Sequence, residues 1–164
     1  MNLLERFWEI ETDLEPLGLC RWSLVPSECV PQGGVVFASL GVDGIQFCVL
    51  PVPKDDDLSR SPVYAVSPMN PDHPLEPLAE NLPAFFSLVV QAGDAGTLES
   101  ASYCTREEFE DAVADPGFGD AFNQERLQSS VALRKAFPFK KIPDPYGYLE
   151  AMRARYPRNI LSIP

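Results

Sequence analysis

Apolar positions are most regular in the middle of the chain, on either side of a short glycine-bounded turn. Residues 35–40 and 45–50 are rich in β-branched, aromatic and other apolar side chains, and they flank the turn at 41–44. The Asp-Gly pair in this turn predicts a β-hairpin, because both residues tolerate positive φ. Cys48 and Leu50 place apolar side chains on the face opposite the main stripe of the second strand. We therefore expect part of this strand to be covered on both sides.

Other strand patterns lie before and after the hairpin. Residues 19–25 predict a strand that Pro26 ends, and residues 63–67 predict another. Residues 68–78 contain four prolines and predict a segment that runs extended over the surface.

The best helical pattern covers residues 81–92. Asn81 suits the N-cap position, and Gly93 suits the C′ position that ends a helix. One complete apolar stripe at helical spacing consists of Leu82, Phe85, Phe86, Val89 and Val90. Burial of such side chains contributes about 1.5–3 kcal/mol each, so this helix should anchor the sheet.

Further helices are predicted over residues 2–10, from the capping box at 105–108 to 115–117, and over 122–136 and 145–156. Leu127 and Val131 are an apolar pair one turn apart in the third of these helices. Because strands precede helices, we predict an α+β fold with an antiparallel sheet of short strands and helices packed on one face. Residues 1–164 should form a single domain, strand-rich over 19–67 and helical over 81–156.

The charge of the chain is strongly negative and unevenly spread. Net charge is −11, with 21 acidic and 5 basic residues in 1–120 but 3 acidic and 8 basic residues in 121–164. Clustered lysines and arginines bind phosphate backbones, so the acidic body should repel nucleic acid and anionic membranes. The basic C-terminal segment could touch either, although docking on the acidic body of its own chain is the simpler interpretation.

Cysteine spacing and the first residues indicate the cytoplasm. Cys20, Cys29, Cys48 and Cys104 lack the spacing of a zinc knuckle or a redox motif, and a chain of this length needs no disulfide. Charged residues interrupt the first apolar stretch, so no signal peptide is predicted. No apolar run approaches the ~20 residues that span a bilayer. We expect free thiols in a cytoplasmic protein that does not bind membranes.

Side chains for catalysis are scarce. The single histidine, His73, lies between prolines in an expected surface loop, without a nucleophile or an orienting partner. One histidine and four scattered cysteines do not supply a zinc site, and the consecutive carboxylates at 55–57 lack calcium-loop spacing. We predict a protein that is not an enzyme, with no catalytic residue, no metal and no cofactor. A carboxylate-dependent hydrolase is the weakest alternative, because spacing does not show which acids lie close together.

The candidate partner-binding residues are two aromatic residues and an acidic loop: Trp22, Tyr64, Asp55, Asp56 and Asp57. Tryptophan and tyrosine anchor interfaces when they are exposed, but in strands they more often belong to the core. The acidic loop is either a contact surface or a solvated turn.

Three short segments resemble a known family. Residues 41–47, 63–67 and 79–86 combine a glycine-bounded strand pair, another strand, and a helix that opens with A-x-N-hydrophobic-x-x-F. Over about residues 20–92 the chain resembles the SUKH superfamily. The resemblance implies an α+β fold without enzymatic activity. Many bacterial members look like immunity proteins that bind and neutralise a toxin domain.

We therefore expect a protein-binding module, most concretely an immunity-type protein that neutralises a toxin partner. A basic toxin domain would suit the acidic charge, because opposite electrostatic fields speed encounter and favour specificity. The alternative is an adaptor or structural subunit of a larger assembly, which would use helix 81–92 or the basic C-terminal segment.

Overall fold

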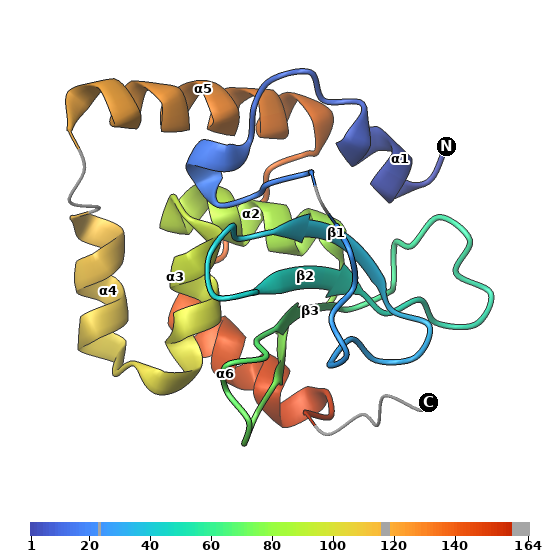
Figure 1. The fold of residues 1–164 in the computed structure, drawn as a ribbon. Coiled ribbons are helices and arrows are strands. Elements are labelled where there is room, and N and C mark those ends of the chain that lie inside the picture. The colour runs from blue at the N-terminus through green and yellow to red at the C-terminus, as the bar shows by residue number, and fades with distance from the viewer. Residues whose placement is uncertain (23, 116–118, 159–164) are drawn as a thin grey trace.

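The computed structural model describes residues 1–22, 24–115 and 119–158 (Figure 1). The strands within these ranges are β1 (Val35–Ser39), β2 (Gln46–Val49), β3 (Val63–Val66) and β4 (Leu75–Ala79). The α-helices are α1 (Leu3–Trp8), α2 (Leu82–Ala92), α3 (Ala95–Ser100), α4 (Arg106–Ala114), α5 (Asp120–Ala136) and α6 (Pro145–Arg155). Two 3-10 turns are η1 (Glu15–Leu17) and η2 (Ala101–Tyr103). The fold is α+β, as predicted.

The sheet is an antiparallel meander in the order β1-β2-β3-β4. The predicted hairpin is confirmed, since Val35 pairs with Val49 and Ser39 with Gln46. Its turn places Asp43 at φ 54° and the following glycine at φ 69°, which is the conformation that the Asp-Gly pair indicated.

Two sequence predictions around the sheet are wrong. Residues 19–25 do not form a strand, because their described residues contribute only a single bridge between Cys20 and Ser39. Residues 68–78 do not simply cross the surface, because β4 begins within them and pairs with β3. Pro77 is tolerated in β4 because this strand lies at the edge of the sheet, where an N–H is not needed on both sides.

Helix α2 lies between the sheet and α5 (Figure 1). Both predicted ends are confirmed: the Asn81 side chain accepts from the N–H of Ala84, and Gly93 ends the helix at φ 78°. The buried Arg126 of α5 also donates from Nε to the Gly93 carbonyl at 2.8 Å. A cation at this end of the helix is favoured by the helix dipole.

An aromatic cluster joins α2 to the layers on both of its sides. The Phe85 ring lies 5.4 Å from that of Phe47 in β2, and the Phe86 ring lies 5.1 Å from that of Phe7 in α1. Phe137, directly after α5, lies 4.6 Å from Phe86. The main core is therefore built on the helical face of the sheet.

The opposite face of the sheet is covered without a packed helix layer. Cys48 and Tyr64 point into a smaller apolar cluster there, closed by Leu24, Val30 and Tyr156. The prediction that β2 is covered on both sides is therefore confirmed. The cover is held in place by Gln46, whose Nε2 donates to the carbonyl of residue 25 at 2.7 Å.

The C-terminal basic segment docks on the body of the chain, as its charge indicated. Arg155 pairs with Glu80 at 3.5 Å, and Arg158 pairs with the buried Glu76 of β4. Residues 137–143 lie against α2, where the Gln91 side chain exchanges two hydrogen bonds with the backbone of residue 142.

The remaining helices lie where they were predicted, but α5 buries a different face from the one that its apolar pair indicated. The pair that indicated α5, Leu127 and Val131, is exposed, whereas Leu133 is buried. Arg126 and Ser129 also face inward, because their polar groups bond to backbone carbonyls of other segments. Polar anchors, not an apolar stripe, therefore orient much of this helix.

The inward face of α5 predicts a large difference between two leucines. Replacing Leu133 by alanine should lower the free energy of unfolding by about 2–5 kcal/mol, because it leaves a cavity in the core. The matched change Leu127→Ala should alter it by less than about 0.5 kcal/mol, because this side chain is in solvent. Urea unfolding monitored by circular dichroism measures both values, and equal losses would contradict the observed face.

Candidate functional site

The five sequence-predicted partner residues do not form one surface. Trp22 is 63% exposed, and Asp56 and Asp57 are exposed in their loop. Tyr64 is only 1% exposed and Asp55 is also buried, so neither side chain is available to a partner. The condition for Trp22 as an interface anchor is met, while Tyr64 belongs to the core.

Asp55 is the structural centre of the acidic loop. Its Oδ2 accepts from the Ser61 hydroxyl at 2.6 Å and from the N–H of Arg60 at 2.8 Å. Burial opposes the charged form, but these hydrogen bonds and the nearby Arg60 guanidinium hold the pKa of Asp55 below its usual range. Asp55 therefore closes the loop on itself.

Tyr64 connects the covered face of the sheet to the C-terminal segment. Its hydroxyl donates to the Pro157 carbonyl at 3.0 Å, and burial together with the nearby Cys48 raises the pKa of this phenol. Burial also raises the pKa of the Cys48 thiol to about 12, which leaves it an unreactive thiol at neutral pH.

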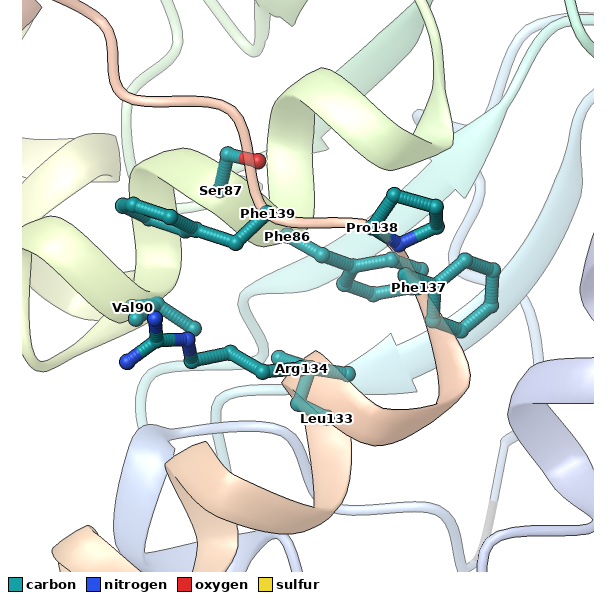
Figure 2. Close-up of a pocket in the computed structure, with 8 residues that line it drawn as sticks. All are labelled: Phe86, Ser87, Val90, Leu133, Arg134, Phe137, Pro138 and Phe139. Carbon is teal, nitrogen blue, oxygen red and sulfur yellow. The ribbon is translucent and has the colours of Figure 1, made fainter.

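Two hollows of the helical side carry no binding chemistry. Figure 2 shows a depression between α2 and the end of α5, where Arg134 lies beneath the Phe139 ring at 4.7 Å. It is too narrow to hold a water molecule. A wider hollow of about 360 Å³ lies between α2 and residues 138–143, and Lys140, Lys141 and Tyr148 are among the residues that line it. Its lysines are exposed, and no buried polar group there lacks a partner.

The candidate site is a cavity of about 360 Å³ beside α3, at the turn end of the hairpin. We name it the Glu99 cavity, and its lining consists of Asp43, Ile45, Ser67, Met69, Asn70, Pro71, Glu99 and Tyr103. Three separate parts of the chain meet here: the β1–β2 turn, the loop after β3, and the end of α3 with η2. No lysine or arginine lines the cavity.

Local geometry explains why these side chains converge. Glu99 and Tyr103 are four residues apart in consecutive helical turns, so they lie on one face. Ser67 directly follows β3, and its N–H donates to the Pro74 carbonyl at 2.7 Å, which closes the loop 67–74. Asp43 reaches the cavity from the hairpin turn, where its positive φ is required by the tight reversal.

The Glu99 carboxylate is the buried polar centre of the cavity. The residue is 5% exposed, and its Oε1 accepts from the Ser67 hydroxyl at 2.9 Å. Its Oε2 accepts from the Tyr103 hydroxyl at 3.0 Å. Burial of that hydroxyl, followed by the negative charge of Glu99 and the hydrogen bond to it, raises the pKa of Tyr103 to about 12. Two hydroxyl donors thus hold the carboxylate in one orientation.

Large apolar side chains are exposed around the mouth of the cavity. Met69 is 76% exposed and the Tyr103 residue is 63% exposed, although its hydroxyl turns inward to Glu99. Methionine and aromatic residues are enriched at protein interfaces, so Met69 and Tyr103 are candidate anchors for a partner.

Catalytic chemistry finds little support in the cavity. Ser67 donates its proton to a carboxylate, which is a far weaker base than an imidazole. His73 is exposed and does not line the cavity. Across residues 1–22, 24–115 and 119–158, no group of three or more histidine, cysteine or acidic side chains could hold a metal ion.

Sequence reasoning did not select any residue of this site. The sequence predicted a turn at Asp43, but it did not predict Ser67, Glu99 or Tyr103 as site residues. A signal for Glu99 was present, because it lies among the regularly spaced apolar residues Ala95, Leu98 and Ala101, all of which are buried.

Comparison of the chain with models of protein families, with curated proteins and with solved structures finds no match. Among the residues placed in the structure, no helix has the length and apolar character needed to cross a bilayer.

The geometry of the cavity predicts a specific change in a phenol titration. Replacing Glu99 by glutamine should lower the pKa of Tyr103 from about 12 toward the ordinary value near 10, because the negative charge beside it is lost. Ultraviolet difference titration of each protein measures the shift, and Tyr103→Phe in both backgrounds assigns it.

The same group makes stability pH-dependent in alkali. The folded state favours the neutral phenol of Tyr103, so this group adds to the free energy of unfolding below pH ~10. This stabilisation is lost as the pH rises to about 12.

For the titration, a Tyr103 pKa that Glu99→Gln leaves unchanged would show that the carboxylate does not act on this hydroxyl.

Proposed function

We propose that this chain is a protein-binding module for a basic partner protein, and most concretely an immunity-type protein that neutralises a toxin. The observation that carries the proposal is the acidic recess of Glu99 and Asp43, which exposed Met69 and Tyr103 also line. This rim of two side chains supplies apolar contact area, while the recess supplies charge selectivity.

The charge distribution supports the same partner chemistry. The surface around the cavity belongs to residues 1–120, which carry 21 acidic and 5 basic residues, and the basic C-terminal segment already pairs with Glu76 and Glu80. A basic partner would be steered toward the remaining acidic surface, and this attraction weakens when salt screens it. The SUKH-like pattern of residues 20–92 agrees with an immunity-type role.

The adaptor alternative has one observation in its favour. Leu127 and Val131 are exposed one turn apart on α5, where a second chain could pack. The helix proposed earlier for this role, 81–92, is not available, because its stripe lies in the core. Because the Glu99 cavity adds a buried carboxylate to its two exposed apolar side chains, the first proposal is preferred.

The proposed function predicts which surface variants weaken binding of the partner. With a basic toxin domain encoded beside this gene as the partner, Met69→Ser and Tyr103→Ser should each weaken binding by about 5–30-fold, as expected for interface anchors. The matched changes Leu127→Ser and Val131→Ser replace equally exposed apolar side chains and should leave the affinity unchanged. Calorimetry at low and high salt measures the dissociation constants, and binding should weaken with salt.

Neutralisation provides the biological measurement. Cells that express the toxin domain should grow when they also express the wild-type chain or the α5 variants, and should fail with the rim variants. Sensitivity to the α5 changes instead of the rim changes would favour the adaptor. Absence of binding and of rescue with every such toxin domain would exclude the immunity role.

A further inference from the structure

We propose that the Glu99 cavity receives an arginine side chain of the partner, with its guanidinium bound to the Glu99 carboxylate. The inference rests on the proposed function and adds the chemistry by which the partner is recognised. Its strongest support is a comparison of the buried carboxylates within the chain itself.

Glu99 differs from the other buried carboxylates in lacking a cation. Among the described residues three carboxylates are buried: Asp55, Glu76 and Glu99. Asp55 has Arg60 at 3.7 Å, and Glu76 is paired with Arg158. No basic side chain of the described chain lies within ion-pair distance of Glu99. Since buried charges are normally paired, the cavity has room and charge for a cation from outside.

The carboxylate has acceptor positions left for two more hydrogen bonds. A carboxylate offers about four acceptor positions, and Ser67 and Tyr103 occupy one on each oxygen of Glu99. The remaining position on each oxygen can take one N–H of a guanidinium, whose fork matches a carboxylate in two parallel bonds. Because the two hydroxyls already fix the carboxylate, little conformational freedom is lost on binding.

The walls favour arginine over lysine. The exposed Tyr103 ring offers a face for a guanidinium to stack on, which a compact ammonium uses less well. Asp43 adds a second negative charge at the mouth. The cavity of about 360 Å³ is many times the ~10–15 Å³ that one water needs on the same measure, so a guanidinium and part of its stem fit.

The test uses a small probe, so that it does not depend on the partner. The chain of residues 1–164 is titrated with the peptide N-acetyl-Gly-Arg-Gly-amide, and NMR follows the ¹³C shift of the Glu99 carboxyl carbon. A saturable shift is expected with this peptide. The same peptide with citrulline, which has the shape of arginine without its charge, should give at least a tenfold weaker response. The lysine peptide should also bind more weakly.

Matched variants localise the effect. Glu99→Gln keeps the side-chain shape and should abolish the response of Ser67 and Tyr103 signals, whereas Asp56→Asn removes the same charge from an exposed loop and should leave it intact. Ser67→Ala removes one orienting hydroxyl and should weaken peptide binding while the fold, judged from the core methyl signals, is kept. Equal responses to arginine and citrulline, or a response that survives Glu99→Gln, would overturn the inference.

Failure of this inference is distinguishable from failure of the proposed function. With the toxin domain, Glu99→Gln should lower the affinity at least tenfold. The rim variants could weaken binding of the toxin domain while the arginine peptide leaves the Glu99 ¹³C shift unchanged and Glu99→Gln leaves the affinity unchanged. This result would keep the proposed binding function and refute the guanidinium site. A larger change of the Glu99 shift with Mg²⁺ than with the arginine peptide would also refute it, in favour of a metal-cation site.

Discussion

The rest of the fold depends on two adjacent phenylalanines of α2, which pack against the sheet on one side and against α1 and the end of α5 on the other. Phe85 contacts the rings of the sheet, while Phe86 contacts Phe7 in α1 and Phe137 after α5. Each aromatic side chain buries a large apolar area, and edge-to-face or offset ring contacts add to it. One helix therefore joins a four-stranded sheet, which would otherwise expose its face, to an outer layer of helices.

This packing also determines where the candidate site forms. Gly93 ends α2 in a left-handed turn, and Asp94 caps α3 directly afterwards. Helix α3 is therefore directed to the end of the sheet where the hairpin turns, as Figure 1 shows. Glu99 meets Ser67 across this junction over 32 residues of sequence. The cavity thus forms because α2 ends at Gly93 and α3 begins directly afterwards. Its carboxylate is held between α3 and the end of β3.

Sequence could predict the elements whose signals are local. The hairpin depends on the Asp43-Gly44 turn, and α2 depends on Asn81, Gly93 and a stripe within eleven residues. In contrast, β4 is a strand because β3 pairs with it, although Pro77 within it and the prolines before it indicate a loop. The inward face of α5 depends on carbonyls that lie far away in the chain. The site as a whole was not predictable, because Glu99 and Ser67 are 32 residues apart in sequence and α3 is too short for a periodic pattern.

The arrangement around Glu99 fits the proposed binding role on physical grounds. A carboxylate that acts as a general acid or base needs a proton to move, and therefore a substrate group or a base within reach. Here both oxygens of Glu99 are held by hydroxyls that are themselves weak acids, since the pKa of Tyr103 is raised to about 12. Such donors fix charge and direction without exchanging protons at neutral pH. A carboxylate fixed in this way, buried and with no cation of the described chain beside it, suits the recognition role proposed above, for which exposed side chains around it would provide the contact area.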